Sequence, residues 1–410
     1  MELVSRHIST WAEELLSVSP VVVIEGARQV GKSTLAQMLS EPDRSVFVTL
    51  DDEVMRGFAL DDPVGLLQSA GERRLVIDEV QRCPDLILPL KAEIDRDRRP
   101  GRFVLTGSAN LLRVPGAQDS LAGRAMTVRL HPFSQGEIAG RRDDWVASIL
   151  AAPTTRWTAA SRREVIDRIT TGGYPPLQGM SPRLRSAWLS DYANRLVERD
   201  SADVAPAQVP VLRRLLRLVA AAPGQELVLE RLAQSLGVAG RTVSRYLEIL
   251  EALFLVQPLP AWSRSLTNRQ VQRAKAYVTD TGLIAVLSGL NAEHLVAPHG
   301  ADHLGGLVEN FVINELMRQQ GWSAVEFSLS HYRDRNGAEV DVIVETPRGI
   351  IAVEVKAASA ATRAHFKHLV GLRERLGSEF IAGIVLHFGA AQQAGDRLWA
   401  LPVGSLWGAT

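Results

Sequence analysis

Short apolar runs alternate with stretches of helical periodicity through the first 130 residues of the chain. The runs are apolar at consecutive positions and not at every second one, which indicates strands that are covered on both faces. They lie at residues 21–24, 46–50, 75–77, 103–105 and 126–130. Because helical stretches separate them, the pattern predicts an α/β fold with a parallel sheet that helices cover on two sides.

Three further patterns follow this region. Residues 141–205 are mostly helical in periodicity. Within residues 226–250 the helical spacing breaks at Gly237 and resumes at Val243, and a short apolar run follows, which is the order of a winged helix-turn-helix. Within residues 337–356 two runs of period two flank a Thr-Pro-Arg-Gly turn, which predicts a β-hairpin.

The composition is that of a globular protein, with 46% hydrophobic and 22% charged residues. The formal net charge is zero, so a nucleic-acid partner would have to bind a local basic patch. The single cysteine, Cys83, excludes an intrachain disulfide and a cysteine-based zinc site. No run of about 18 apolar residues occurs, and residues 1–16 have the pattern of an amphipathic helix and not of a signal peptide. We therefore expect a cytoplasmic protein with no membrane partner.

Lysine is rare in this chain. Only five of the 46 basic residues are lysines, namely Lys32, Lys91, Lys275, Lys356 and Lys367. Since arginine is the usual cation here, a lysine hints at a compact donor that a guanidinium cannot replace.

The most specific motif follows the first apolar run and reads G-x-x-x-x-G-K-S-T. It comprises Gly26, Ala27, Arg28, Gln29, Val30, Gly31, Lys32, Ser33 and Thr34. The glycines let backbone N–H groups close around phosphates at a helix N-terminus, while Lys32 reaches the β- and γ-phosphates and Ser33 binds Mg²⁺. A chance match is the alternative, but the flanking strand and helix are the context that a phosphate loop requires. The motif therefore predicts an ATP site.

Two carboxylates, Asp78 and Glu79, follow the third apolar run. In a P-loop enzyme the first would hold Mg²⁺ through water, and the second would polarise the attacking water. An exposed strand end with incidental acids is the alternative. Together with the loop, the pair predicts hydrolysis of the bound nucleotide.

Further polar residues follow the fourth apolar run and precede the fifth. Thr106 and Ser108 are placed to contact a γ-phosphate or the attacking water, although either could equally be a helix N-cap. Arg124 is a candidate charge-stabilising arginine, supplied in cis or by a neighbouring subunit, because phosphoryl transfer accumulates negative charge. A solvated surface arginine is the alternative, and use of Arg124 in trans would require a homo-oligomer.

These motifs, at residues 26–33, 75–79 and 105–108 in this order, resemble those of AAA-type ATPases. The resemblance implies a P-loop ATPase domain that uses ATP and Mg²⁺, with Ser108 at the sensor position. The asparagine often found at that position in the family is absent here.

The predicted C-terminal hairpin carries a second set of charged residues. Side chains repeat every two residues along a strand, so the hairpin brings Asp341, Glu354 and Lys356 together at one end. The two carboxylates would hold Mg²⁺ against a scissile phosphate, with Lys356 steering the attacking water or offsetting charge. A buried acid–lysine pair with a structural role is the alternative.

The order D…E-x-K in a strand-turn-strand resembles the PD-(D/E)XK nuclease fold, with Val340 in place of the proline of the family name. Glu309, on a predicted apolar helix, matches the acidic residue that such folds often carry upstream, so the resemblance adds it to the metal ligands Asp341 and Glu354. With residues 275–283, these stretches resemble a widespread prokaryotic family that joins an AAA-type ATPase to a C-terminal domain of unknown function related to restriction endonucleases.

We therefore expect a P-loop ATPase domain at residues 1–140, a helical lid or linker at 141–205, a winged-helix-like domain at 206–262 and a restriction-endonuclease-like α/β domain at 263–410. The leading hypothesis is a Mg²⁺-dependent ATPase that couples nucleotide turnover to a nuclease-like domain acting on DNA. The alternative is a nucleotide-dependent switch or scaffold whose C-terminal domain binds protein or nucleic acid without cleaving it.

Overall fold

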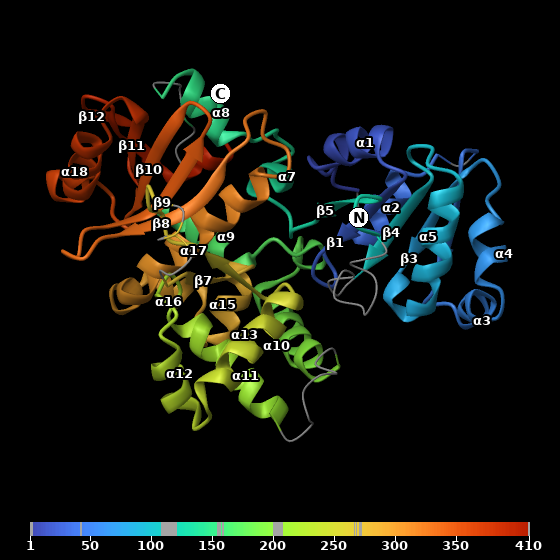
Figure 1. The fold of residues 1–410 in the computed structure, drawn as a ribbon. Coiled ribbons are helices and arrows are strands. Elements are labelled where there is room, and N and C mark those ends of the chain that lie inside the picture. Colours follow the sequence, from blue (N-terminus) through green and yellow to red (C-terminus); the bar gives the residue numbers. More distant parts are fainter. Residues whose placement is uncertain are drawn as a thin grey trace. The chain divides into compact units, whose positions relative to one another are not determined.

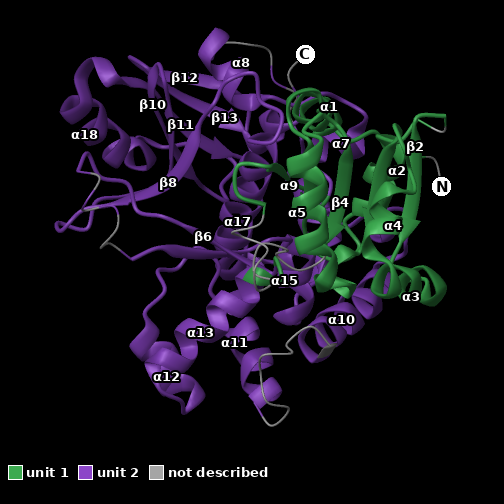
Figure 2. Ribbon diagram, turned by 45° about the vertical axis from the view of Figure 1, so that its right-hand side comes forward, with its two compact units in different colours: residues 1–132, 252–254 green, residues 133–251, 255–410 purple. Residues whose placement is uncertain are grey.

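The computed structural model describes residues 3–41, 43–107, 121–153, 157, 160–199, 208–265, 267, 269 and 273–408. The chain divides into two compact units, which Figure 2 shows in different colours. The first comprises residues 1–132 and 252–254, and the second comprises residues 133–251 and 255–410. In the described ranges, no helix combines the length and apolar character needed to cross a membrane.

The first unit holds a five-stranded parallel sheet with the strand order β2-β3-β4-β1-β5 (Figure 1). All four apolar residues of β1 have no exposed surface, so the sheet is covered on both faces at this strand, as the consecutive apolar positions predict. The parallel α/β architecture is confirmed. The strands are β1 (Val21–Glu25), β2 (Ser45–Thr49), β3 (Arg74–Asp78), β4 (Phe103–Gly107) and β5 (Ala125–Arg129).

Helices of this unit pack on the sheet. Ile87, Leu90 and Ile94 of α5 lie in one apolar cluster with Val23 of β1 and Ile77 of β3. The helices are α1 (Ser9–Val18), α2 (Lys32–Met38), α3 (Glu53–Asp61), α4 (Pro63–Gln68) and α5 (Ile87–Arg96).

The sequence predicts a helix over residues 1–16, but the observed N-terminal helix is shorter. Helix α1 starts at Ser9, and residues 3–8 are not helical. Arg6 lies in this non-helical segment and is buried, and its guanidinium donates to the backbone oxygens of Val30 at 2.8 Å and His131 at 2.6 Å. The segment is therefore held against the loop that follows β1, which explains why the helix begins late.

The second unit contains a six-stranded mixed sheet with the order β12-β13-β11-β10-β9-β8 and a separate antiparallel pair, β6 and β7. The predicted hairpin is confirmed, because β9 and β10 pair in antiparallel register with Thr346 opposite Gly349. The strands are β6 (Val256–Leu259), β7 (Lys275–Val278), β8 (Ser328–Arg333), β9 (Glu339–Thr346), β10 (Gly349–Val355), β11 (Phe380–His387), β12 (Gln392–Gly395) and β13 (Leu398–Pro402).

Helices cover the large sheet. Leu369 of α18 packs in one cluster with Ile350 and Ala352 of β10, while Ile351 and Val353, which point to the other face, are also fully buried. The helices of this unit are α7 (Gln135–Ala139), α8 (Trp145–Ala151), α9 (Arg162–Thr171), α10 (Pro182–Arg199), α11 (Val209–Ala221), α12 (Leu229–Leu236), α13 (Gly240–Ala252), α15 (Thr281–Leu287), α16 (Ala292–Val296), α17 (Ala301–Gln319) and α18 (Lys367–Leu376).

The break predicted between two helices near Gly237 is present. Helix α12 ends at Leu236, Gly237 adopts a left-handed φ of 69°, and α13 begins at Gly240. Strand β6 follows and pairs with β7.

Candidate nucleotide site and acid–lysine cluster

The loop between β1 and α2 has a backbone that few residues other than glycine could adopt. Gly26 and Gly31 have φ angles of 156° and 96°. A Cβ atom at Gly26 would lie 2.2 Å from the backbone oxygen of Leu130, so a side chain there would displace the chain that leaves β5. The two glycines of the motif are therefore required by the fold of the loop itself.

Lys32 opens helix α2 and is 5% exposed. Its Nζ donates to the backbone oxygen of Ala27 at 2.9 Å. The ammonium thus lies against the loop, with a neutral acceptor that a phosphate oxygen can replace. This geometry fits the predicted role of Lys32 toward a nucleotide.

Asp78 is the centre of a hydrogen-bonded set beside the loop. Its Oδ1 accepts from Ser33 Oγ at 2.7 Å and from Thr106 Oγ1 at 2.5 Å, and its Oδ2 accepts from Thr49 Oγ1 at 3.3 Å. Strand β4 lies between β1 and β3, which places Thr106 between the loop and the acid. The two predicted Mg²⁺ ligands, Ser33 and Asp78, are therefore direct neighbours.

These residues fit Mg²⁺ bound together with a nucleotide. Mg²⁺ favours oxygen ligands and commonly takes one or two carboxylates beside substrate phosphates, and Ser33 and Asp78 supply a hydroxyl and a carboxylate. Among the described residues, no group of three or more His, Cys, Asp and Glu is arranged to hold a metal ion. Phosphate oxygens of a bound nucleotide would supply further ligands of the ion.

Glu79 follows Asp78 with a left-handed φ of 56°, which is rare for a residue other than glycine. Its N–H donates to Thr106 Oγ1 at 3.1 Å, and its carboxylate accepts from the amide of Gln81. Functional sites are where such conformations concentrate. Strand β3 ends at Asp78, and Glu79 forms the turn into the short 3-10 helix Val80–Arg82.

The other predicted residues of this unit are placed differently. Ser108 lies outside the described residues. Arg124 forms a two-point ion pair with Asp95 of α5, in which Nε and Nη2 each lie 2.8 Å from a carboxylate oxygen. The Arg124 guanidinium lowers the pKa of Asp95 below its ordinary value. The described contacts of Arg124 are thus those of a salt bridge, and its action on a phosphate stays a prediction.

In the second unit the hairpin brings Asp341, Glu354 and Lys356 together, as predicted. Lys356 Nζ lies 2.6 Å from Glu354 Oε1 and 3.9 Å from Asp341 Oδ2. Asp341 also accepts from the N–H of Val355 at 2.8 Å. We call the larger group to which they belong the acid–lysine cluster, which consists of Lys275, Tyr277, Glu309, Glu339, Asp341, Glu354 and Lys356.

Lys275 of β7 lies among the carboxylates of this cluster. It is 2% exposed, and its Nζ lies 3.0 Å from Glu309 Oε1, 2.8 Å from Glu339 Oε1 and 4.0 Å from Asp341 Oδ1. Tyr277 donates to the same Glu309 oxygen at 2.6 Å. An ammonium thus contacts two of the three acids that the sequence predicts as metal ligands. The sequence analysis did not place Lys275 in this site. The rarity of lysine in the chain was the signal that could have marked it as a site residue.

The cluster holds more carboxyl groups than lysines. Burial, with the neighbouring Asp341 carboxylate, raises the pKa of Glu309 and of Glu354 to about 7. Burial opposes the charge of Lys275, but Glu309, Asp341 and Glu339 outweigh it and raise the pKa of this lysine. Glu354 Oε2 is buried and has no hydrogen-bond partner in the described part of the chain.

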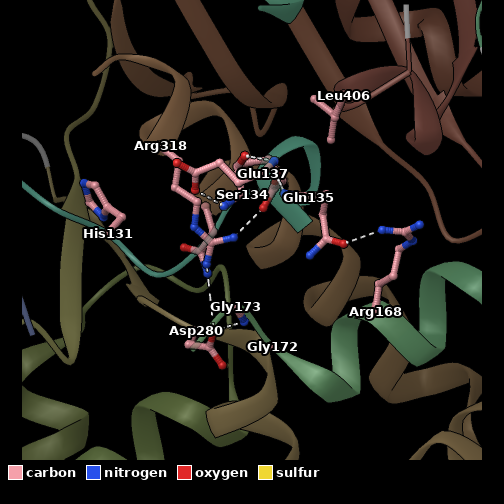
Figure 3. Close-up of polar contacts among 12 residues, drawn as sticks. His131, Ser134, Gln135, Glu137, Arg168, Gly172, Gly173, Asp280, Arg318 and Leu406 are labelled. Carbon is pink, nitrogen blue, oxygen red and sulfur yellow. Dashed lines mark hydrogen bonds and ion pairs between the residues drawn. The ribbon is translucent and has the colours of Figure 1, made fainter. Parts of the chain in front are cut away.

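A separate buried network holds other parts of the second unit together (Figure 3). Asp280 lies, like Lys275, in the stretch of residues 275–283. It caps α15 by accepting from the N–H of Leu283 at 3.2 Å. It also accepts from the N–H of Gly173 at 2.7 Å and lies 3.8 Å from Arg318 of α17. Burial raises the pKa of Asp280. Its contacts join α15, α17 and the turn after α9, so this part of the stretch is structural.

Three families match consecutive parts of the chain. Residues 18–139 match the family described as AAA domain, residues 162–294 match a domain of unknown function (DUF8612), and residues 304–406 match another (DUF4143). Together with the phosphate loop and the parallel sheet, the match at residues 18–139 identifies this part of the chain as an AAA-type P-loop ATPase domain.

Relatives extend the similarity over most of the chain. The uncharacterized protein Rv2008c of Mycobacterium tuberculosis is 30% identical over 357 residues, which cover 86% of this chain and 74% of that protein. The chain belongs to the family of this mycobacterial protein. An uncharacterized protein of Haemophilus influenzae is 24% identical over 295 residues, covering 68% of this chain and 64% of the relative. Among solved structures, the Walker-type ATPase of Pyrococcus abyssi is 14% identical, with a TM-score of 0.45, covering 70% of this chain and 96% of that one.

Proposed function

We propose that the protein is a Mg²⁺-dependent ATPase that couples nucleotide turnover to a nuclease-like domain acting on DNA. The observation that supports the ATPase half is the direct contact of Ser33 and Asp78 beside the buried Lys32. Bound Mg²⁺ would supply positive charge to the phosphates, held by Ser33 and Asp78. Lys32 would exchange the Ala27 carbonyl for phosphate oxygens, and Glu79 would orient the attacking water.

Two further contacts belong to this proposal. Ser108 would contact the γ-phosphate, and Arg124 would exchange Asp95 for the negative charge of the transferred phosphoryl group. If Arg124 acts in a neighbouring subunit, the active form is a homo-oligomer. A strictly monomeric protein with full ATPase activity would reject that arrangement.

The DNA-acting half is supported by two features of the second unit. Asp341, Glu354 and Lys356 meet at one end of the hairpin, in the order that resembles PD-(D/E)XK nucleases. Arg241 and Arg245 are exposed near the start of α13, where a winged helix would meet the major groove.

A second candidate function is favoured by Lys275. Its ammonium lies among Glu309, Glu339 and Asp341, so the acids as arranged do not fit a divalent ion. A cluster neutralised in this way is suited to a switch or scaffold that binds nucleic acid or protein without cleaving it.

A panel of DNA and RNA substrates, with Mg²⁺ or Mn²⁺ and with or without ATP, tests the two functions. Cleavage by the wild type that is lost in Asp341→Ala and in Lys356→Ala supports the nuclease. An inactive wild type that still hydrolyses ATP supports the non-cleaving alternative. An unaltered ATPase rate in Lys32→Ala would reject both candidate functions.

A further inference from the structure

A basic cavity of about 480 Å³ lies in the second unit, outside the acid–lysine cluster. Five arginines line it, together with only two acids, Glu226 and Asp334; the arginines are Arg264, Arg273, Arg333, Arg335 and Arg375. In a chain whose formal net charge is zero, this is a marked local concentration of positive charge. The volume is that of a small-ligand pocket.

Two of these arginines have their charge available to a ligand. Arg273 and Arg335 are exposed, and neither forms an ion pair with any residue in the described ranges. Arg264 and Arg333 pair with Glu379 at 3.2 Å and with Glu226 at 3.3 Å. Among the described residues, the cavity therefore combines two guanidinium groups that have no ion-pair partner with two that pair with the exposed Glu379 and the half-buried Glu226.

The aromatic floor of the cavity is not a stacking platform. Trp262 and Tyr332 pack edge to face with ring centres 6.1 Å apart, and the guanidinium of Arg375 lies 4.8 Å from the centre of the Tyr332 ring. Both rings are nearly buried, so their faces are already covered. The cavity is built to bind an anion through guanidinium groups and not to stack a base.

Two buried polar atoms in the lining have no hydrogen-bond partner among the described residues. They are Nε1 of Trp262, which can only donate, and Nδ1 of His331. Nε2 of His331 lies 3.0 Å from the backbone oxygen of Arg273, which can only accept, so the ring proton is on Nε2 and Nδ1 is an acceptor. A ligand that suits both atoms carries an anionic oxygen and a hydroxyl or amino group.

We propose that this arginine pocket binds a phosphate group of a nucleic-acid strand, with the phosphate on Arg273, Arg335 and Trp262 and a sugar hydroxyl or base amino group on His331. The pocket borders the acid–lysine cluster, because Arg333 of its lining lies opposite Glu339 in the antiparallel register of β8 and β9, and Glu339 contacts Lys275. The inference rests on the proposed action of this unit on nucleic acid and assigns where a strand is held. A free nucleotide shares this chemistry and is the other source of such a phosphate.

The test measures binding of the full chain to a fluorescent single strand of about 20 nucleotides by anisotropy, over a series of salt concentrations. The variant is Arg273→Glu with Arg335→Glu. The control is Arg183→Glu with Arg348→Glu, which changes the charge equally at two exposed arginines outside the pocket. Melting temperatures of both variants verify folding, and unlabelled AMP serves as the competitor that represents a free nucleotide.

The pocket variant is expected to bind the strand about tenfold more weakly or worse, with a salt slope smaller by about one, while the control binds like the wild type. Equal affinity and slope in the two variants would overturn the pocket, even if the wild type cleaves DNA. A wild type that binds no strand, or that binds only AMP at these arginines, would overturn it as well. If the wild type binds the strand without cleaving it and the pocket variant loses this binding, the proposed strand site is supported and the proposed nuclease activity is rejected.

Discussion

The two candidate sites each contain a buried lysine, and the described surroundings of the two lysines differ. Lys32 donates to a neutral backbone carbonyl of the phosphate loop, whereas Lys275 contacts three carboxylates. A carbonyl is readily exchanged for a phosphate oxygen, but carboxylates already neutralise the ammonium that they surround. We propose that the same side chain receives an anion in the first unit and takes the place of a cation in the second.

Replacing Lys275 tests this difference most strongly. In Lys275→Met the acids Glu309 and Glu339 lose their buried counter-ion, so the free energy of unfolding should fall by about 3–5 kcal/mol. Added Mn²⁺ should restore part of the loss, because a divalent ion can then enter. Thermal melts with and without Mn²⁺ measure both effects, and the exposed Lys367→Met is the control. A variant as stable as the wild type would contradict the role of Lys275.

Replacing Lys32 should affect turnover and not folding. Lys32→Ala removes the donor that would meet the phosphates, so ATP hydrolysis should fall by at least about 100-fold. Phosphate release measures the rate. Lys91→Ala, in helix α5 of the same unit, is the matched control and should keep its activity.

Arg6 should have a smaller effect on the same site. In Arg6→Ala the loop loses a charged donor to the backbone oxygens of Val30 and His131, so KM for ATP should rise by about tenfold. Arg6→Lys should give an intermediate KM for ATP, because a single ammonium group does not present the fixed, planar set of donors that a guanidinium does. Steady-state kinetics measure this, with the exposed Arg44→Ala as control. An unchanged KM in Arg6→Ala would show that the loop keeps its shape without this residue.

The pH dependence of stability should report Glu354, which faces Asp341, Lys356 and Glu309. Its pKa is about 7 in the folded protein against an ordinary value of 4.5, so the folded state binds this proton more tightly. The contribution of Glu354 to the free energy of unfolding therefore falls as the pH rises from about 4.5 to about 7. Glu354→Gln should not show that decline. Its free energy of unfolding relative to that of the wild type should therefore be higher at pH 8 than at pH 5. Urea unfolding at the two pH values checks this, and a pH-independent difference would contradict it.

Local patterns predicted the parts of the two sites that lie within one element or across one turn. The phosphate loop follows from its motif between a strand and a helix, and the meeting of Asp341 with Glu354 follows from the period of two and a short turn. The contacts that were missed join distant segments. Arg6 reaches His131, and Lys275 reaches Glu309 on a helix, because tertiary packing brings them together. Periodicity reports which face a residue occupies and not which remote element docks there.

We propose that ATP turnover at Lys32 is coupled to nucleic acid held by the second unit. The most direct test is the rate of Mg²⁺-dependent ATP hydrolysis by the full chain with and without saturating single-stranded DNA, with Lys32→Ala as the inactive reference. We expect DNA to change the rate of the wild type and Lys32→Ala to be inactive in both conditions. A wild-type rate that stays the same while anisotropy shows the DNA to be bound would contradict the coupling.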